Sequence, residues 1–203
     1  MKLRHLISTT LTLGVLLSVG CNVIPEAKPD PTKFFILNDP EATSSSGEKL
    51  GITLGLLPLE LPVYLDNSRS IAVASPGNQI EFRDFDRWAE SMDDGITRVL
   101  QSALARTPGI ARVKVPPFSV GTKRDFDLQI RIIHAEGFEA GESRSLRFAL
   151  AFELTSPDEA FIHLDTYTAP FTSWDGSSSE LATLLSAAIA NAAQDIATKI
   201  PPR

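Results

Sequence analysis

One run of alternating side chains constrains the fold more than any other feature of this 203-residue sequence. Within residues 126–135, Phe126, Leu128, Ile130 and Ile132 fall on one face of an extended chain, and Asp127, Gln129 and Arg131 fall on the other. A strand with this period lies in a sheet that has one wet face and one covered face. The rest of the chain must therefore supply elements that cover the apolar face.

Two segments with helical periodicity are candidates for that cover. The first is predicted over residues 86–106, with an apolar stripe that begins at Trp88, and it ends at Pro108 and Gly109. The second opens with the capping box Ser177-x-x-Glu180, and its stripe of Leu, Ala and Ile side chains extends to residue 196. We expect both helices to pack on the sheet.

Further strands are predicted from β-branched and aromatic runs that turn residues bound. They cover residues 34–37, 70–74, 79–82, 111–115, 146–154 and 161–171, and an extended apolar stretch covers 50–61. The order is β-rich, helix, β-rich, helix. This order predicts an α+β fold, in which a single domain has an antiparallel or mixed sheet with two main helices packed on it.

The charge and the cysteine content exclude several classes of function. The formal net charge is −6, which argues against nucleic acid as a partner because nucleic acid binding depends on basic patches. The single cysteine allows no disulfide within the chain, and the three histidines lack the short spacing of a zinc site. We therefore predict no metal and no cofactor.

The N-terminus has the layout of a secretion signal. Lys2 and Arg4 precede a short apolar stretch that ends in small residues and is too short to cross a bilayer. The signal peptide is predicted over residues 1–20, and Cys21 follows it directly. This arrangement resembles the lipobox of bacterial lipoproteins, with Ser18 where an aliphatic residue is usual. The alternative is a plain secretory signal with a chance cysteine.

The lipobox resemblance implies that Cys21 is the lipidation site. In such lipoproteins the thiol takes a diacylglyceryl group, and after cleavage the new amine is acylated, for example with palmitate. Asn22 follows Cys21 where Asp retains enterobacterial lipoproteins in the inner membrane, so the resemblance favours an outer-membrane lipoprotein that faces the periplasm. Residues 21–32 are rich in proline and charge, which predicts a lipidated tether, and residues 33–203 are the predicted periplasmic domain.

No catalytic constellation is recognisable from spacing. The sequence has no nucleophile elbow, P-loop or H-E-x-x-H motif. His134 and His163 lie in predicted strands, where we interpret them as ordinary side chains. An acidic group surrounds the predicted start of the first helix, where carboxylates are favoured by the helix dipole: Asp84, Asp86, Glu90, Asp93 and Asp94. We expect this group to be a solvated face, and we expect that the protein is not an enzyme.

A discriminating block extends from Leu57 to Leu104. It reads L-P-L-E-L-P-V-Y-L-D at residues 57–66, then S-I-A-V at 70–73, N-Q-I-E-F at 78–82 and D-F-D-R-W-A-E-S-M at 84–92. This succession resembles the ABC-type transport auxiliary lipoprotein family, the PqiC-like lipoproteins. The aromatic strand at 34–37 matches the early strand of that family, with Phe where Tyr is common.

The family resemblance implies the function and the partners. Such lipoproteins act beside mammalian-cell-entry (MCE) domain proteins with an ABC permease and ATPase, in systems that move lipids or other hydrophobic molecules between membranes. The resemblance implies an accessory docking subunit that is held in the outer membrane by its acyl chains. Since MCE proteins form rings, a matching homo-oligomer is left open.

Four residues of the block are candidates for partner binding. Tyr64, Leu65 and Asp66 lie in a proline-flanked loop and could form an aromatic anchor of an interface, although a local structural role is equally compatible. Trp88 is the other candidate, and core packing is its alternative role. Arg87 could pair with Asp84 or Glu90.

Two other functions remain open. One is a lipid-binding carrier, which requires an apolar cavity inside the domain. The other is an assembly lipoprotein of the outer membrane, whose partner is a β-barrel protein.

Overall fold

The computed structural model describes residues 29–39, 51–66 and 68–201. Residues Thr32–Arg203 form one compact unit, to which the description below refers. The predicted signal peptide, the predicted lipidation site Cys21 and most of the predicted tether lie outside the described residues.

The described residues of this unit form one mixed sheet and three helices. The strands are β1 (Lys33–Phe35), β2 (Ile52–Leu56), β3 (Ser70–Ser75), β4 (Gln79–Trp88), β5 (Ile110–Lys114), β6 (Phe126–Ala140), β7 (Ser143–Thr155) and β8 (Ile162–Thr168). The helices are α2 (Val63–Asp66), α3 (Met92–Arg106) and α4 (Ser178–Thr198). The predicted α+β class, with two main helices and a mixed sheet, is confirmed.

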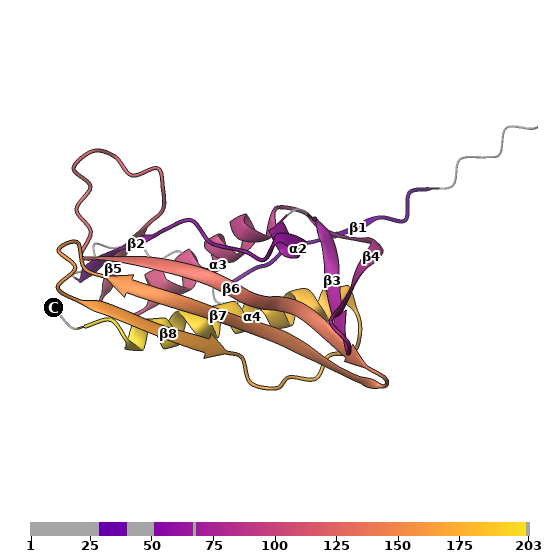
Figure 1. Cartoon of the computed structure of the whole chain (residues 1–203). Helices are drawn as coiled ribbons and strands as arrows, with labels where there is room; N and C mark the ends of the chain where they lie inside the picture. The colour runs from indigo at the N-terminus through magenta and orange to yellow at the C-terminus, as the bar shows by residue number, and fades with distance from the viewer. Residues whose placement is uncertain (1–28, 40–50, 67, 202–203) are drawn as a thin grey trace, which may run out of the picture. The chain divides into compact units, whose positions relative to one another are not determined.

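Strand β6 lies at the centre of the sheet (Figure 1). One of its edges pairs with β7 in an antiparallel hairpin, and β8 extends the sheet beyond β7. Its other edge is shared, because β2 pairs in parallel with the first part of β6 and β3 pairs in parallel with the last part. Strand β5 lies beyond β2, and β4 and then β1 lie beyond β3.

The predicted alternation of β6 is confirmed and explains its buried face. Leu128, Ile130 and Ile132 are at most 2 % exposed, whereas Arg131 is exposed. The register with β7 shifts between Ile132 and His134, which leaves Ile133 as a bulge. Since one extra residue moves every later side chain to the opposite face, Ala135 is the next core residue after the bulge.

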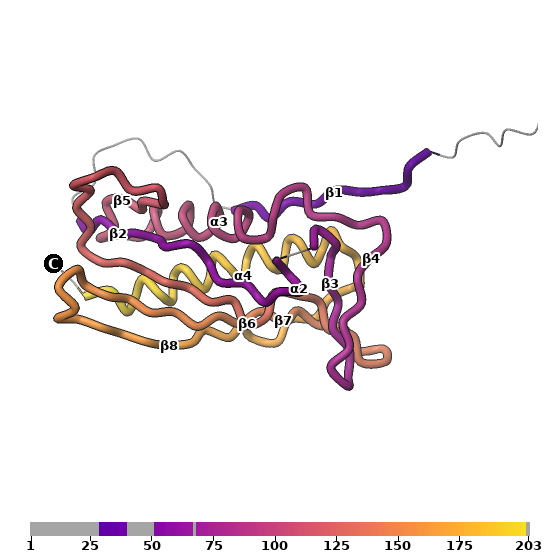
Figure 2. The backbone as a smooth tube through the Cα atoms, turned by 45° about the horizontal axis from the view of Figure 1, so that its top comes forward, coloured from indigo at the N-terminus to yellow at the C-terminus, as the bar shows by residue number. Residues whose placement is uncertain are grey.

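Helices α3 and α4 lie together on the buried face of the sheet (Figure 2). The helix α4 contributes Leu181, Leu185, Ile189 and Ile196 to the same core cluster that contains the inward side chains of β6 and β7. Buried alanines at positions 188, 192 and 193 allow close packing of α4. The sheet thus has one face that the two long helices cover and one face that they leave open.

The predicted start of the first long helix was wrong. Helix α3 begins at Met92, with Ser91 as its N-cap, and residues 86–88 belong to β4. The reason is tertiary, because β1 pairs with the end of β4 and places Phe35 beside Trp88. The acidic group predicted for one helix start is therefore divided: Asp93 and Asp94 lie in the first turn of α3, and Asp84 and Asp86 lie on β4.

The capping box of α4 is confirmed with one difference. The Ser177 hydroxyl accepts from the backbone N–H of Glu180 at 3.2 Å, as predicted. The Glu180 carboxylate does not return to Ser177 and instead accepts from the backbone N–H of Asp175 at 2.6 Å. The backbone N–H of Ser177 donates to the Asp175 carboxylate. The chain before α4 is thereby fixed together with the first helical turn.

The segment from Leu37 to Asp39 fastens the N-terminal strand to both helices. The Leu37 carbonyl accepts from Arg98 of α3 at 2.6 Å, and the backbone N–H of Asn38 donates to Ser186 Oγ of α4 at 3.0 Å. The Asp39 carboxylate is 3 % exposed and forms an ion pair with Arg106 of α3. These contacts hold the β1 end of the chain in place.

We predict that Asp39→Ala lowers the free energy of unfolding by about 3 kcal/mol, because it breaks a mostly buried ion pair with the Arg106 guanidinium. Urea unfolding followed by circular dichroism measures this change. The control is Glu90→Ala, which breaks the more exposed Glu90–Arg98 pair and costs less than about 1 kcal/mol. Equal costs for the two variants would contradict the importance of the Asp39 pair.

Candidate functional site

The four sequence-predicted binding residues do not form one surface. Leu65 and Trp88 are each 4 % exposed and belong to the core cluster, at the end of α2 and the end of β4. Tyr64 is half-buried and packs against this cluster, and Asp66 is exposed. Of the four, only Tyr64 and Asp66 therefore have side chains that reach the surface.

Helix α2 closes a gap in the sheet. Along the edge of β6 that β2 and β3 share, neither strand pairs with residues 129–136. The chain from Leu57 to Glu60 follows this edge, and the backbone of Glu60 bonds to Ile130 and Ile132 of β6. Residues 63–66 then form α2, which connects this segment to β3.

A hydrogen bond attaches α2 to β6. The Tyr64 hydroxyl donates to Glu136 Oε2 at 2.9 Å. Glu136 is 1 % exposed, and its Oε2 also accepts from the backbone N–H of Ala135 at 2.7 Å. Its other oxygen, Oε1, lies 2.8 Å from His134 Nδ1. The buried carboxylate thus has three polar partners, as a buried acidic group requires.

The environment of Tyr64 raises its pKa. The largest cause is burial, which disfavours the charged phenolate, and the negative charge and hydrogen bond of Glu136 add to it. Burial also raises the pKa of Tyr167, with a smaller contribution from Asp195. These are the only two tyrosines of the chain, so an absorbance titration reports on both together.

We predict that the folded chain shows less tyrosinate absorbance at pH 10 than a denatured chain, which is about half ionised at that pH. A pKa that is raised by folding means that the folded state holds the proton more tightly. The corresponding stability is complete below pH 10 and is lost as the pH rises above that value. Tyr64→Phe should weaken this alkaline loss, measured by urea unfolding between pH 9 and 11. A folded chain that titrates like the denatured one would contradict the assignment.

A groove of about 470 Å³ lies on the sheet face that has no helix. Its walls are Gln129 and Arg131 of β6 with Glu60 on one side, and Leu164 and Thr166 of β8 on the other. Between the walls, β7 contributes Ala151 and Glu153, and the small alanine side chain keeps the groove open. Glu60 belongs to the sequence block that was singled out above, and its backbone bonds position it beside Arg131.

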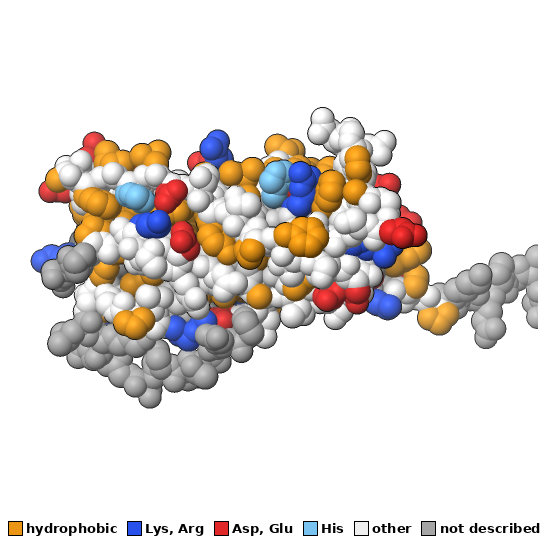
Figure 3. Space-filling view, turned by 90° about the horizontal axis from the view of Figure 1, so that it is seen from below, with side chains coloured by type: hydrophobic (Ala, Val, Ile, Leu, Met, Phe, Trp, Pro, Cys, Tyr) orange, Lys and Arg blue, Asp and Glu red, His pale blue; other side chains and the backbone are white. Residues whose placement is uncertain are grey.

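The groove combines apolar and charged groups. Leu164 is 68 % exposed and the neighbouring Ile162 is 52 % exposed, although both belong to a regular strand. Glu60, Arg131 and Glu153 supply charges of both signs around them. On the β8 side of the molecule, hydrophobic side chains form patches with charged side chains between them (Figure 3). Exposed apolar side chains within a charged rim are typical of protein–protein interfaces.

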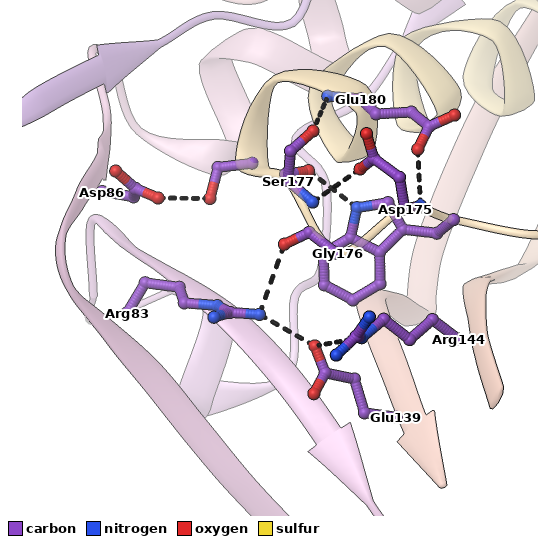
Figure 4. Close-up of polar contacts among 10 residues, drawn as sticks. Arg83, Asp86, Glu139, Arg144, Asp175, Gly176, Ser177 and Glu180 are labelled. Atoms are coloured by element: carbon purple, nitrogen blue, oxygen red, sulfur yellow. Dashed lines mark hydrogen bonds and ion pairs between the residues drawn. The ribbon is translucent and has the colours of Figure 1, made fainter. Parts of the chain in front are cut away.

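A second polar cluster joins three elements at the start of α4 (Figure 4). Arg83 of β4 donates to Glu139 of β6 at 2.8 Å and approaches the carbonyl of Gly176. Arg144 of β7 lies 3.4 Å from the same Glu139 carboxylate. The hydroxyl of Ser178 donates to Asp86 of β4 at 2.6 Å. The contacts hold β4, the β6–β7 hairpin and α4 together, which is a structural role.

Trp174 is the centre of this cluster, and the sequence patterns did not identify it. The side chain is 4 % exposed, and its Nε1–H donates to the Ser177 carbonyl at 2.7 Å. The guanidinium of Arg83 lies 5.8 Å from the ring centroid. The ring occupies the space over Gly137, where an added Cβ would approach Cη2 of Trp174 to 2.7 Å.

We predict that Gly137→Ala lowers the free energy of unfolding by about 2 kcal/mol, because the new methyl group overlaps the Trp174 ring. Thermal and urea unfolding measure the change. In a double-mutant cycle, Trp174→Phe should relieve part of this cost, since the smaller ring vacates space. Fully additive costs of the two substitutions would contradict the predicted overlap.

The remaining chemical groups of the described residues do not form a metal site. Among the residues that the structure describes, no group of three or more His, Cys, Asp or Glu side chains could hold a metal ion. His134 contacts Glu136, and His163 lies near the rings of Phe152 and Phe161. No helix in the described ranges is long and apolar enough to cross a membrane.

Comparison with protein families identifies a family that this chain matches over most of its length. The family described as the ABC-type transport auxiliary lipoprotein component matches residues 35–197. The matched range includes β2–β8, helix α3, helix α4 except its last residue, and the groove on the open sheet face. No curated protein sequence matches the chain.

Two solved structures share the fold. An uncharacterized protein is 13 % identical in sequence with a TM-score of 0.65, and the match covers 84 % of this chain and 99 % of that one. Protein XCC0632 from Xanthomonas campestris, of the family DUF330, is 15 % identical with a TM-score of 0.62, and the match covers 81 % of this chain and 89 % of that one. At these identities the likeness establishes the fold alone.

Proposed function

This chain belongs to the family of ABC-type transport auxiliary lipoprotein components, and from that premise we propose that it docks on the MCE-domain protein of an ABC transport system for lipids or other hydrophobic molecules. The observation that carries the proposal is the groove on the helix-free sheet face. The permease and ATPase would supply transport and energy, and this chain would contribute binding.

The groove has the properties of a docking surface for a folded partner. Leu164 and Ile162 offer apolar area, and Arg131 with Glu60 and Glu153 can specify the orientation of the partner. These residues lie on paired strands, and Glu60 is held by backbone bonds to β6, so the surface is preorganised.

The arrangement favours docking over the alternative of a lipid carrier. A carrier needs an apolar cavity between the sheet and the helices. In the described part of the chain, that space contains a single core cluster in which Leu54, Leu100, Leu128, Leu150 and Leu185 are fully buried. The groove opens on the opposite face of the sheet.

The proposal places the protein in the cell envelope through its lipid anchor. Cys21 would carry the acyl chains, and residues 22–32 would link them to the domain. An outer-membrane position with the domain in the periplasm would let the chain meet an MCE assembly that extends from the inner membrane. The family assignment supports the lipoprotein character of the chain.

We predict that Leu164→Asp and Arg131→Glu each reduce recovery of the MCE-domain protein about tenfold, which corresponds to about 1.4 kcal/mol of binding free energy. The first change removes exposed apolar area, and the second reverses a charge at the rim. The measurement is an affinity pull-down of the tagged, acylated chain from membranes in mild detergent, with quantitative mass spectrometry of proteins and lipids.

The matched control is Val120→Asp, which adds the same charge at a fully exposed position outside the groove and should leave recovery unchanged. If neither groove variant changes the recovery of the MCE-domain protein, this groove is not the docking site. Recovery of a β-barrel protein in place of an MCE protein would support the assembly function, and stoichiometric lipid without a protein partner would support the carrier.

A further inference from the structure

A second groove, of about 440 Å³, lies between the N-terminal strand and helix α4. Phe34, Phe35 and Ile36 line one side, and Ala182, Thr183 and Ala187 of α4 line the other. None of the described residues that line this groove is charged. In this respect it differs from the groove on the open sheet face, whose lining includes Glu60, Arg131, Glu153 and Asp165.

The backbone keeps two large apolar side chains on the surface beside this groove. Phe34 is 66 % exposed and Ile36 is 53 % exposed. In an extended chain alternate side chains point to opposite sides, so the burial of Leu37 and the partial burial of Phe35 direct Phe34 and Ile36 outward. The bonds of Leu37 to Arg98 and of Asn38 to Ser186 fix this orientation.

This exposed apolar edge lies where the tether enters the domain. Phe34 follows the proposed lipid anchor at Cys21 by thirteen residues, a span of roughly 45 Å when fully extended. Acyl chains on Cys21 would therefore keep this edge near the membrane surface, so that the effective concentration of membrane at the edge is high. Lys33 is exposed next to Phe34, in a position where its ammonium group can meet a lipid phosphate while its stem lies along the apolar surface.

We propose that the Phe34–Ile36 edge and the groove beside it rest on the membrane and take up lipid acyl chains. The absence of charged residues from the described lining fits hydrocarbon and does not fit a charged protein partner. The short tether would also keep this edge close to the bilayer. The membrane-facing surface lies on the helix-covered side of the sheet, and the proposed partner groove lies on its other side. The inference rests on the proposed lipid anchor and does not depend on the MCE partner.

Tryptophan quenching in vesicles tests the proposal without any transport partner. The acylated chain is placed in vesicles of phosphatidylethanolamine and phosphatidylglycerol whose acyl chains are brominated, because bromine quenches tryptophan that contacts the hydrocarbon. The variants are Phe34→Trp and Ile36→Trp, so that one of them can fail to fold without ending the test. The native Trp88 and Trp174 are each 4 % exposed and supply a constant background.

The control is Phe171→Trp, at a position that is 77 % exposed and outside the groove lining. The proposal predicts that the added emission at positions 34 and 36 shifts to the blue and is mostly lost in brominated vesicles, whereas the emission at position 171 is retained. Equal quenching at all three positions, or none at 34 and 36, would overturn it. A blue shift at positions 34 and 36 that occurs only after an MCE protein is added would also overturn it, because the groove would then be occupied by a protein.

Discussion

The pairing of strand β6 is the constraint on which the rest of the unit depends. This strand bonds to β7 along one edge and to both β2 and β3 along the other, so it sets the register of the central sheet. Its alternating side chains also decide which face is apolar, and helices α3 and α4 cover that face. The two faces of the molecule, one with helices and one without, follow from this strand.

The bulge at Ile133 gives β6 a second role. Without the extra residue, the side chain of Glu136 would continue the inward phase of Leu128, Ile130 and Ile132. With the bulge, Glu136 is paired in register with the exposed Arg147, and its carboxylate accepts a hydrogen bond from the Tyr64 hydroxyl. One carboxylate, buried and fully bonded, therefore attaches the short helix α2 at the gap between β2 and β3.

Local patterns predicted the elements whose stability is local or whose period is regular. The alternation of β6 and the capping box of α4 are of this kind, and both were confirmed with small differences in extent or bonding. The end of β4 was mistaken for a helix because its strand partner, β1, lies about fifty residues earlier in the chain. No local sequence pattern indicates that β1 pairs with the end of β4.

The candidate site depends even more on distant contacts. Tyr64 was singled out, but its partner Glu136 is 72 positions away, and Trp174 could be interpreted only through the space above Gly137. Leu65 and Trp88 were candidates for partner binding with a structural role as the alternative, and both lie in the core. The groove of the open face combines residues from the extended segment near residue 60 and from β6, β7 and β8, which no spacing in the sequence brings together.

The central claim is that the two sides of the sheet have different occupants, a protein on the open side and lipid on the helix side. Photo-crosslinking in living cells, with a benzoylphenylalanine residue at position 164 or at position 34, tests it most directly. The account predicts an MCE-domain adduct from position 164 and a phospholipid adduct from position 34. The same adduct from both positions, or the reverse assignment, would contradict it.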